Sequence, residues 1–305
     1  MNKILLTGGS GFFGQYLKKA LSKNGNVKTI GISDNDDIFF DLSKGIPEIN
    51  DTYDLVVHAA GKAHVVPKNG EDVKLFYDVN HKGTVNLLKA FERRGYYPER
   101  FVFISTVAVY GLESGSDIKE DTPLEASDAY GKSKILAEKE IMEWGKKNNV
   151  LITILRLPLL TGKNAPGNLG AMISAIKKGR FAIIGKGDTK RSMVYADDVA
   201  VFISGISKTG GVYNLTDGYH PTYKELALAV GQVLNKRPYV VVPNALAIMM
   251  ARTADVVQKI TGKDLPFSFR RLKKLTSSLT FNDSKARNKG WDPHKVLDVV
   301  DEWVK

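Results

Sequence analysis

Residues 3–14 read KILLTGGSGFFG, an apolar run that leads straight into a glycine-rich turn. Glycines at positions 8, 11 and 14 give the spacing G-x-x-G-x-x-G. Such a turn needs glycine because the backbone folds back tightly and a pyrophosphate must approach it without meeting a Cβ atom. A helix that follows then directs free N–H groups at the phosphates. The stretch predicts a dinucleotide-binding unit at the start of the chain rather than a tight turn alone.

Short apolar runs alternate with helix-length segments through the first half of the chain. The runs are rich in Val, Ile and Leu and nearly continuous in apolar character, as expected for strands of a parallel sheet covered on both faces. They lie at 3–7, 27–32, 54–59, 101–105 and 151–156, with helical segments at 11–24, 79–94 and 127–148. This alternation predicts an α/β fold of the Rossmann type with a doubly wound parallel sheet.

After residue 158 the pattern becomes irregular. Helical patterns at 169–178, 222–235 and 245–260 are separated by Gly and Pro residues. We expect a smaller, interleaved C-terminal substrate-binding lobe, with the segment 193–215 returning to the first lobe. The predicted division is a dinucleotide-binding domain of residues 1–160 plus about 190–217, and a substrate-binding lobe of residues 161–189 plus 218–305.

The composition excludes several classes of protein. The 305 residues are 43% hydrophobic and 25% charged, which is ordinary for a globular protein, and there is no cysteine. Thiolate chemistry, Cys-ligated zinc and disulfides are therefore excluded, and a cytoplasmic location is expected. The five histidines show no ligand spacing, so no metal is expected.

The net charge of the chain is +11. Residues 259–289 hold nine basic and two acidic residues, which leaves a net charge of +7 on this stretch. A basic surface attracts polyanions, but the sequence carries no nucleic-acid-binding signature, so no nucleic-acid partner is expected. Membrane docking through the helix at 245–260 is an alternative that we do not expect, because this helix can pack within the second lobe.

Two further elements carry chemistry. Tyr130 and Lys134 are four residues apart at the start of a predicted helix and share one face of it. A nearby ammonium lowers the pKa of a tyrosine toward the working range of a general acid or base. The run STVAVYG at 105–111 ends a strand one crossover upstream, and open α/β sheets bind ligands beyond the carboxyl ends of their strands. Thr106 and Tyr130 are therefore expected to converge on one substrate oxygen.

Together these stretches resemble the extended short-chain dehydrogenase/reductase family, in its NAD-dependent nucleotide-sugar epimerase/dehydratase group. The matching pieces run through the whole chain in order: TGGSGFFG (7–14), HAAG (58–61), VNHKGTVNLL (79–88), STVAVYG (105–111), YGKSK (130–134) and DSKARNKGWDP (283–293).

The resemblance implies that Tyr130 is the catalytic proton donor and acceptor, that Lys134 holds the nicotinamide ribose and tunes Tyr130, and that Thr106 bonds the reacting sugar oxygen. The expected cofactor is NAD; NADP stays open, although no Arg follows the second strand to accept a 2′-phosphate. The expected cofactor contacts are Gly8, Gly11, Phe12, Phe13, Gly14, Asp34, Asp41, Leu42, Ala59, Ala60, Gly61, Asn80, Ser105, Tyr130, Lys134 and Leu157.

The implied partner is a nucleotide-diphosphate sugar. Arg191 is the candidate for holding its diphosphate, because a guanidinium can pair with phosphate oxygens at two points, and Asn168 is a second substrate contact. The resemblance also implies a homodimer built by the helices that contain residues 80–94 and 130–144.

Departures from the family pattern narrow the reaction. The family's 4,6-dehydratases carry Asp-Glu after the active-site Thr, whereas Val107 and Ala108 stand here and cannot exchange protons. A 4-epimerase or a 4-ketoreductase remains, and Leu159, where many epimerases carry Asn, favours a ketoreductase or an epimerase with an altered site. The run 164–173 resembles the subgroup that serves bacterial surface polysaccharides. A hypothesis from another class is a dinucleotide-sensing protein without chemistry.

Overall fold

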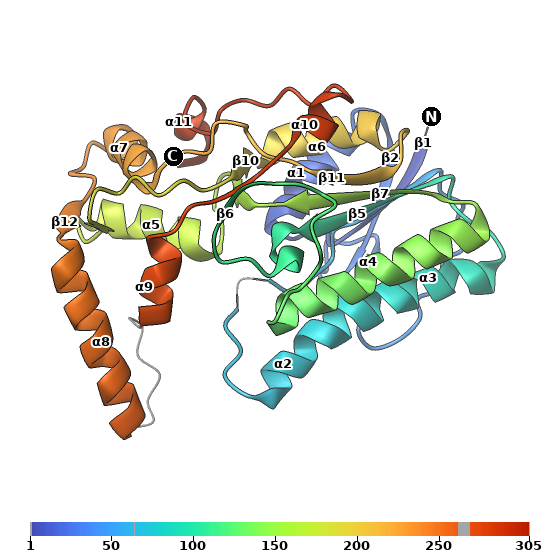
Figure 1. The fold of residues 1–305 in the computed structure, drawn as a ribbon. Helices are drawn as coiled ribbons and strands as arrows, with labels where there is room; N and C mark the ends of the chain where they lie inside the picture. Colours follow the sequence, from blue (N-terminus) through green and yellow to red (C-terminus); the bar gives the residue numbers. More distant parts are fainter. Residues whose placement is uncertain (1, 64, 262–268, 305) are drawn as a thin grey trace.

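A seven-stranded parallel sheet forms the centre of the molecule in this computed structural model, which describes residues 2–63, 65–261 and 269–304 (Figure 1). The strand order is β11-β7-β5-β4-β1-β2-β3, and every pair in it is parallel. The strands are β1 (Asn2–Thr7), β2 (Gly25–Gly31), β3 (Ile38–Phe39), β4 (Leu55–His58), β5 (Arg100–Thr106), β7 (Leu151–Leu157) and β11 (Gly211–Asn214). The predicted α/β fold with a doubly wound parallel sheet is confirmed.

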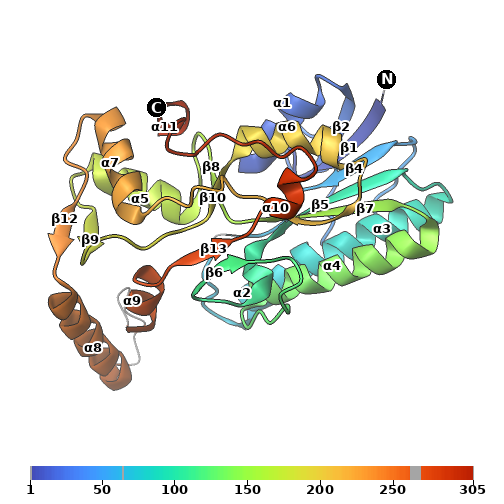
Figure 2. The same ribbon diagram turned by 45° about the horizontal axis from the view of Figure 1, so that its top comes forward.

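Helices cover both faces of this sheet (Figures 1 and 2). On one face lie α1 (Phe12–Leu21) and α6 (Ala196–Ile206), and on the other lie α3 (Gly83–Arg94) and α4 (Ala129–Asn148). Successive side chains of a strand point to opposite faces, so Ile4 and Leu6 enter the core under α1 and α6, whereas Leu5 enters the core under α3 and α4. This double burial explains why the strands are apolar along their whole length.

The second predicted helix begins earlier than expected. The sequence predicts a helix from 79 to 94, but helical backbone begins with α2 (Gly70–Phe76) and runs through a π-helical segment, Tyr77–Lys82, into α3. Asn69 caps α2 by accepting from the Asp72 backbone N–H at 2.8 Å. The π-helical segment widens the helix at Asn80, a residue that the site uses.

The second half of the chain builds a further core around helices α5 (Gly167–Lys177), α7 (Tyr223–Leu234) and α11 (Val300–Val304). Three two-stranded parallel sheets accompany it: β8 (Leu159–Thr161) with β10 (Met193–Tyr195), β9 (Ala182–Ile184) with β12 (Val240–Val242), and β6 (Gly115–Ile118) with β13 (Leu279–Phe281). Two more helices, α8 (Asn244–Thr261) and α9 (Phe269–Leu275), contact each other and project from the body. The boundaries of the two predicted lobes stay a prediction.

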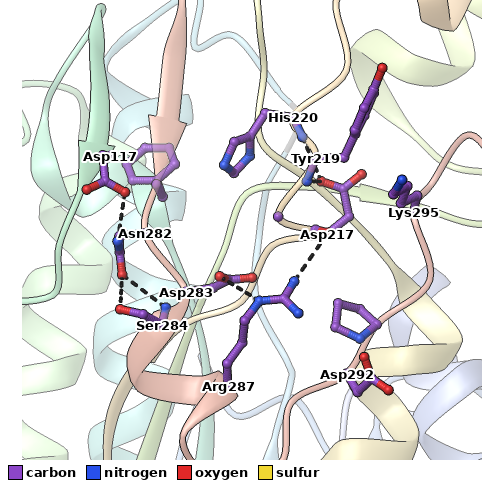
Figure 3. Close-up of a pocket in the computed structure, with 13 residues that line it drawn as sticks. Asp117, Asp217, Tyr219, His220, Asn282, Asp283, Ser284, Arg287, Asp292 and Lys295 are labelled. Atoms are coloured by element: carbon purple, nitrogen blue, oxygen red, sulfur yellow. Dashed lines mark hydrogen bonds and ion pairs between the residues drawn. The ribbon is translucent and has the colours of Figure 1, made fainter.

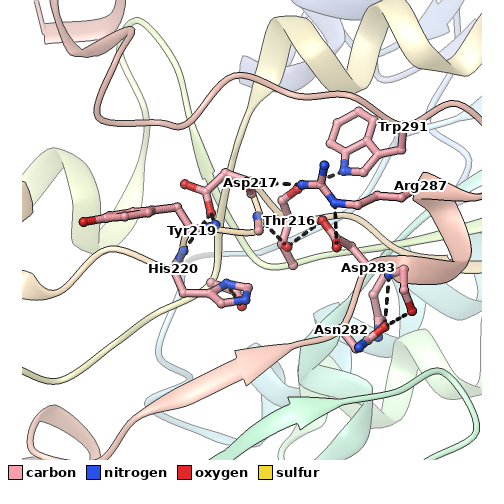
Figure 4. A network of polar contacts seen from close by, with 12 residues as sticks. Thr216, Asp217, Tyr219, His220, Asn282, Asp283, Arg287 and Trp291 are labelled. Carbon is pink, nitrogen blue, oxygen red and sulfur yellow. Dashed lines mark hydrogen bonds and ion pairs between the residues drawn. The ribbon is translucent and has the colours of Figure 1, made fainter.

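The C-terminal segment returns to the first core. Ala286, in α10 (Ser284–Arg287), and Trp291 pack in the same cluster as Ile4 and Leu6. The Trp291 indole donates to the Thr216 carbonyl at 2.8 Å, and the buried Asp217 carboxylate accepts from the backbone N–H groups of three residues: Tyr219, His220 and Val296 (Figure 4). These bonds fasten the tail to the loop that follows β11.

In the described part of the chain, no helix is long and apolar enough to cross a membrane. Residues 262–268, which belong to the basic stretch predicted at 259–289, lie outside the described residues.

Candidate active site

The glycine turn between β1 and α1 leaves no room for side chains. Gly8 has φ of 71°, and a Cβ on it would lie 2.8 Å from the Ala60 backbone. A Cβ on Gly14 would overlap the Gly8 carbonyl oxygen. Gly11 caps α1 without a side-chain hydrogen bond, so the first N–H groups of the helix are left for an anion. This bare, turned backbone fits the pyrophosphate of a dinucleotide.

Two acidic residues, the predicted Asp34 and its neighbour Asp36, follow the end of β2. Asp34 is exposed in the loop, whereas the Asp36 carboxylate accepts from the Ser33 backbone N–H at 3.1 Å and lies against Gly31, the last residue of β2. A dinucleotide-binding fold places its ribose-binding carboxylate at this strand end. Gly31 makes room for Asp36 because it lacks a side chain, so Asp36 is a second candidate for the ribose, and the contact predicted for Asp34 stays a prediction.

Other predicted cofactor contacts lie around this edge of the sheet. Asp41 accepts from the backbone N–H and the hydroxyl of Ser43, at 2.9 and 2.7 Å. Leu42 is buried in the core beneath α3. Phe12 and Phe13 are half-buried on the first turn of α1, and Leu157 is buried at the end of β7. Their contacts with a cofactor stay predictions.

Asn80 joins the loop after β4 to α4. Its amide accepts from the Lys62 backbone N–H at 2.7 Å and donates to the Lys62 carbonyl and to the Ser133 hydroxyl, at 3.1 and 3.0 Å. Ala60, in the same loop, donates its backbone N–H to the Thr7 hydroxyl at 3.0 Å. These bonds fix the wall made by Ala59, Ala60 and Gly61 against the start of α4, and Asn80 acts in the structure of that wall.

His58 is a neutral part of this wall. The Thr84 hydroxyl donates to the Asn80 carbonyl, so it must accept from Nε2 of His58, 2.9 Å away, and Nδ1 accepts from the Thr7 hydroxyl at 2.6 Å. Burial, together with the charge of Lys134, lowers the pKa of His58 to about 3. A histidine held in one tautomer and stacked on Phe103 is a structural residue.

Thr106 and Tyr130 meet at the carboxyl end of β5. Thr106 is the last residue of β5, and Tyr130 is the second residue of α4, whose first turn Asp128 caps by accepting from the Gly131 N–H at 3.0 Å. Thr106 and Tyr130 therefore lie beside each other, and their convergence on one substrate oxygen stays a prediction. Burial raises the pKa of Tyr130, and a hydrogen bond from Thr106 offsets only part of that rise.

The expected effect of Lys134 on Tyr130 is absent from this arrangement. The sequence predicts that the Lys134 ammonium lowers the pKa of Tyr130, yet that pKa is raised. The reason is the position of Lys134, whose Nζ donates to the Ile104 carbonyl at 2.6 Å and lies 4.0 Å from the centre of the Phe103 ring. Burial lowers the pKa of Lys134 to about 7, against the opposing charge of Glu138.

A buried charged network lies beneath these residues, and sequence reasoning missed it. Glu138 follows Lys134 by one helical turn and pairs with Arg156 of β7, with Nη2 2.8 Å from Oε2. Arg156 also donates to the Tyr110 hydroxyl at 3.0 Å. The Ser105 hydroxyl donates to Glu138, so the side chain of this predicted cofactor contact is directed into the network. Glu138 could have been found from its i+4 spacing to Lys134.

The predicted substrate residues lie on two other elements. Asn168 is exposed on the first turn of α5, and Arg191 is half-buried where its backbone bridges Leu279. Their roles in binding a substrate stay predictions. No cluster of potential metal ligands occurs among the described residues.

A separate cavity of about 510 Å³ lies beside the loop after β11 and α10 (Figure 3). The Arg287 side chain there pairs with Asp283 at 3.0 Å, and the Asn282 amide donates to Asp117 at 2.7 Å. These side chains bond to one another and anchor the tail, and none of the predicted catalytic residues lines the cavity.

The geometry of a dinucleotide turn beside a Thr–Tyr–Lys cluster agrees with the comparisons. Residues 4–215 match the NAD dependent epimerase/dehydratase family. The chain belongs to this family. It is therefore an enzyme of a family whose cofactor is NAD, and the turn at Gly8, Gly11 and Gly14 is the part of the fold that fits that cofactor.

Relatives of the family are similar over nearly the whole chain. N-acetyl-alpha-D-glucosaminyl-diphospho-ditrans,octacis-undecaprenol 4-epimerase of Escherichia coli O157:H7 is 31% identical over 303 residues, covering 95% of this chain and 90% of the relative. UDP-glucose 4-epimerase of Vibrio cholerae is 29% identical over 283 residues, covering 85% of each. The structure of Thermus thermophilus UDP-glucose 4-epimerase in complex with NAD shares the fold, with a TM-score of 0.73 at 22% identity over 99% of this chain and 97% of that one.

Proposed function

We propose that the enzyme is a 4-epimerase that inverts carbon 4 of a hexose attached to a diphosphate, with Tyr130 as its acid and base. The observation that carries the proposal is that the Thr106 and Tyr130 side chains lie together at the carboxyl end of β5, where Thr106 acts on the Tyr130 hydroxyl and lowers its pKa against the effect of burial. Both hydroxyls belong to the edge of the sheet onto which the glycine turn opens.

The reaction needs a proton and a hydride to leave the same carbinol. The glycine turn would hold NAD, which when bound would supply the acceptor and donor for the hydride of carbon 4. Tyr130 accepts the O4 proton as the C4–O4 double bond forms and gives it back when that bond is reduced. Thr106 would hold the same oxygen during each transfer, and the keto sugar would turn over between the two transfers so that its opposite face is reduced. Atoms and electrons balance over one turn of this cycle, so no outside reductant is consumed.

Dehydration is not supported by this site. Val107 and Ala108 follow Thr106 in a 3-10 helix, and the Ala108 N–H donates to the Thr106 hydroxyl at 3.2 Å. Neither side chain can protonate a leaving hydroxyl. One-way reduction of a 4-keto sugar is the second candidate, favoured by Leu159 of β8, which lacks a polar group to bind a sugar hydroxyl.

The relatives support the class of substrate. One of them acts on a sugar joined through diphosphate to undecaprenol, and another acts on a UDP-sugar. The shared chemistry is a hexose on a diphosphate, and Arg191 is our candidate for pairing with it. We place the enzyme in the cytoplasm, in the synthesis of surface polysaccharide, as a homodimer built on α3 and α4, where Leu136 and Met142 are exposed.

The test is to incubate the purified enzyme with UDP-N-acetylglucosamine, UDP-glucose or a polyprenyl-diphosphate N-acetylglucosamine, and to separate the 4-epimers by chromatography. We expect product without added reductant, and a loss of about 10²–10⁴-fold in Tyr130→Phe with NAD affinity kept. Val201→Phe, at an exposed position of α6 outside the predicted site residues, is the control and should keep full turnover. Reduction of a 4-keto sugar by NADH without any epimerisation would favour the ketoreductase, and full turnover in Tyr130→Phe would exclude the mechanism.

A further inference from the structure

Helix α8 is packed on one side only. Ala247 and Ala251, one turn apart, are buried against Leu272 of α9 in a small cluster of their own. The single acidic residue of α8, Asp255, belongs to the same side, because its carboxylate accepts from the Phe269 backbone N–H at 3.3 Å. The sequence favours packing of this helix within the second lobe, and the structure restricts that packing to a narrow strip.

The other side of α8 is apolar and exposed. Met249 is 60% exposed, Met250 51% and Val256 55%. Leu246 and Val257 are exposed beside them. The spacing i, i+3, i+4, i+10 and i+11 places these five side chains in one stripe along the helix. We call this stripe (Leu246, Met249, Met250, Val256 and Val257) the α8 face. The exposed Thr253 interrupts the stripe between Met250 and Val256, but five exposed apolar side chains on one side of a helix still mark an interaction site.

Basic side chains border the α8 face. Arg252 and Lys259 are exposed and seven residues apart, so they lie along one edge of the stripe. Lys273 of α9, the helix that packs on α8, is also exposed. The chain as a whole carries a net charge of +11. The α8 face is therefore an apolar stripe with cations along one edge, and the single acidic residue of the helix lies on the packed side. This pattern fits a partner with an apolar interior and an anionic surface.

The helices α8 and α9 also have a shape that fits a flat anionic surface. Figures 1 and 2 show α8 projecting from the body with α9 beside it, so its length of about 27 Å can lie flat on a plane. A second copy of the chain would fit the charges poorly, because it would bring two sets of these cations together.

We propose that the α8 face docks the enzyme on an anionic lipid membrane. The apolar side chains enter the boundary between head groups and acyl chains, while Arg252 and Lys259 contact the anionic head groups. Docking itself is independent of the reaction. The benefit of docking rests on the proposed function. Docking would hold the enzyme at the membrane surface where a sugar diphosphate on a lipid carrier is found, and would thereby favour the lipid-linked sugar as substrate over a soluble nucleotide sugar.

The experiment is co-sedimentation of the full-length enzyme with vesicles of phosphatidylglycerol and phosphatidylethanolamine in about 0.15 M salt, with phosphatidylcholine vesicles as the neutral comparison. We expect binding to the anionic vesicles, a fall of at least about tenfold in affinity for Met249→Gln/Met250→Gln, and a smaller fall for Lys259→Gln. The matched control is Val201→Gln/Leu228→Gln, which removes two exposed apolar side chains elsewhere and should bind as the wild type does.

The other outcomes decide against the proposal. It is overturned if the wild type stays in solution with anionic vesicles, or if Met249→Gln/Met250→Gln binds them unchanged. If the wild type does not bind vesicles and sediments as a dimer, whereas Met249→Gln/Met250→Gln sediments as a monomer, the α8 face would instead be a contact with a second copy of the chain. Circular dichroism of the variants checks their folding. Turnover of a soluble UDP-sugar should be unchanged in Met249→Gln/Met250→Gln, so failure of docking and failure of the epimerase proposal are read separately.

Discussion

The Glu138 carboxylate and the Arg156 guanidinium face each other between α4 and β7, with Arg156 Nη2 2.8 Å from Glu138 Oε2. Both side chains are buried, and Arg156 Nε lies 3.2 Å from the second carboxylate oxygen. Because Glu138 follows Lys134 by one helical turn, its charge also acts on the lysine of the site and raises the pKa that burial lowers. One ion pair therefore serves both the packing and the electrostatics of the site.

Breaking this pair from one side should destabilise the protein. We expect Glu138→Gln to lower the free energy of unfolding by roughly 3–5 kcal/mol, because Arg156 stays charged and buried without its partner. The measurement is urea unfolding monitored by circular dichroism. The double variant Glu138→Leu/Arg156→Met removes both charges and should recover a large part of the loss; a double variant as unstable as Glu138→Gln would show that the ion pair is not the cause.

The low pKa of Lys134 makes stability depend on pH. The folded protein loses this proton near pH 7, whereas an unfolded lysine keeps it to about pH 10.4, so the unfolded state binds more protons between these values. The free energy of unfolding should therefore rise from about pH 7 to 9, by at most about 1.4 kcal/mol per pH unit, relative to Lys134→Met. Comparison with this variant cancels the other titrating groups. Parallel pH profiles for the two proteins would mean that Lys134 is charged throughout.

Two glycine-to-alanine substitutions should have opposite effects, one on NAD binding and the other on stability. Gly14→Ala should abolish NAD binding, since its Cβ would overlap the Gly8 carbonyl oxygen and open the turn. Gly205→Ala, at an exposed position of α6 with nothing near the new Cβ, should raise the free energy of unfolding by about 0.5–1 kcal/mol. NAD titration by fluorescence and thermal unfolding check the pair. Normal NAD affinity in Gly14→Ala would contradict the assignment of the turn.

Asp36 should matter more than Asp34 for the cofactor. We expect Asp36→Asn to weaken NAD binding by about tenfold, because a charged hydrogen bond to the ribose is lost at the end of β2. Asp34→Asn should bind NAD as the wild type does, because Asp34 is exposed in the loop. Calorimetry on both variants decides which carboxylate holds the ribose, and the reverse order would restore Asp34 to that role.

Local signals carried most of what could be predicted. The apolar run at 151–156 became β7 and the run at 101–105 became β5, each within a residue or two, because a strand buried on both faces needs continuous apolar side chains. Gly14 could be assigned to a turn because a steric demand at one backbone position can be read from one residue. The proximity of Thr106 and Tyr130 followed from the edge of the sheet at which parallel strands end.

Long-range pairings could not be predicted in this way. Glu138 could be noted from its spacing to Lys134, but its pairing with Arg156 could not be predicted, because only the packing of α4 against β7 brings the two side chains together. The choice between Asp34 and Asp36 depends on how a loop turns after Gly31, which local propensity does not decide. The exposure of Met249 and Met250 depends on what the rest of the chain leaves uncovered. In each case the deciding quantity is a tertiary position rather than a residue type.

The shared core of Ile4 and Trp291 orders events during synthesis. The ribosome synthesises β1 long before Trp291. In the nascent chain that face of the sheet therefore stays partly uncovered until Trp291 has been synthesised and its indole can bond to the Thr216 carbonyl. The core on that face of the sheet is therefore completed only after every strand of the central sheet has been synthesised. A chain truncated before Trp291 would carry every predicted catalytic side chain but would leave the core around Ile4 incomplete, which makes it a target of chaperones and proteases.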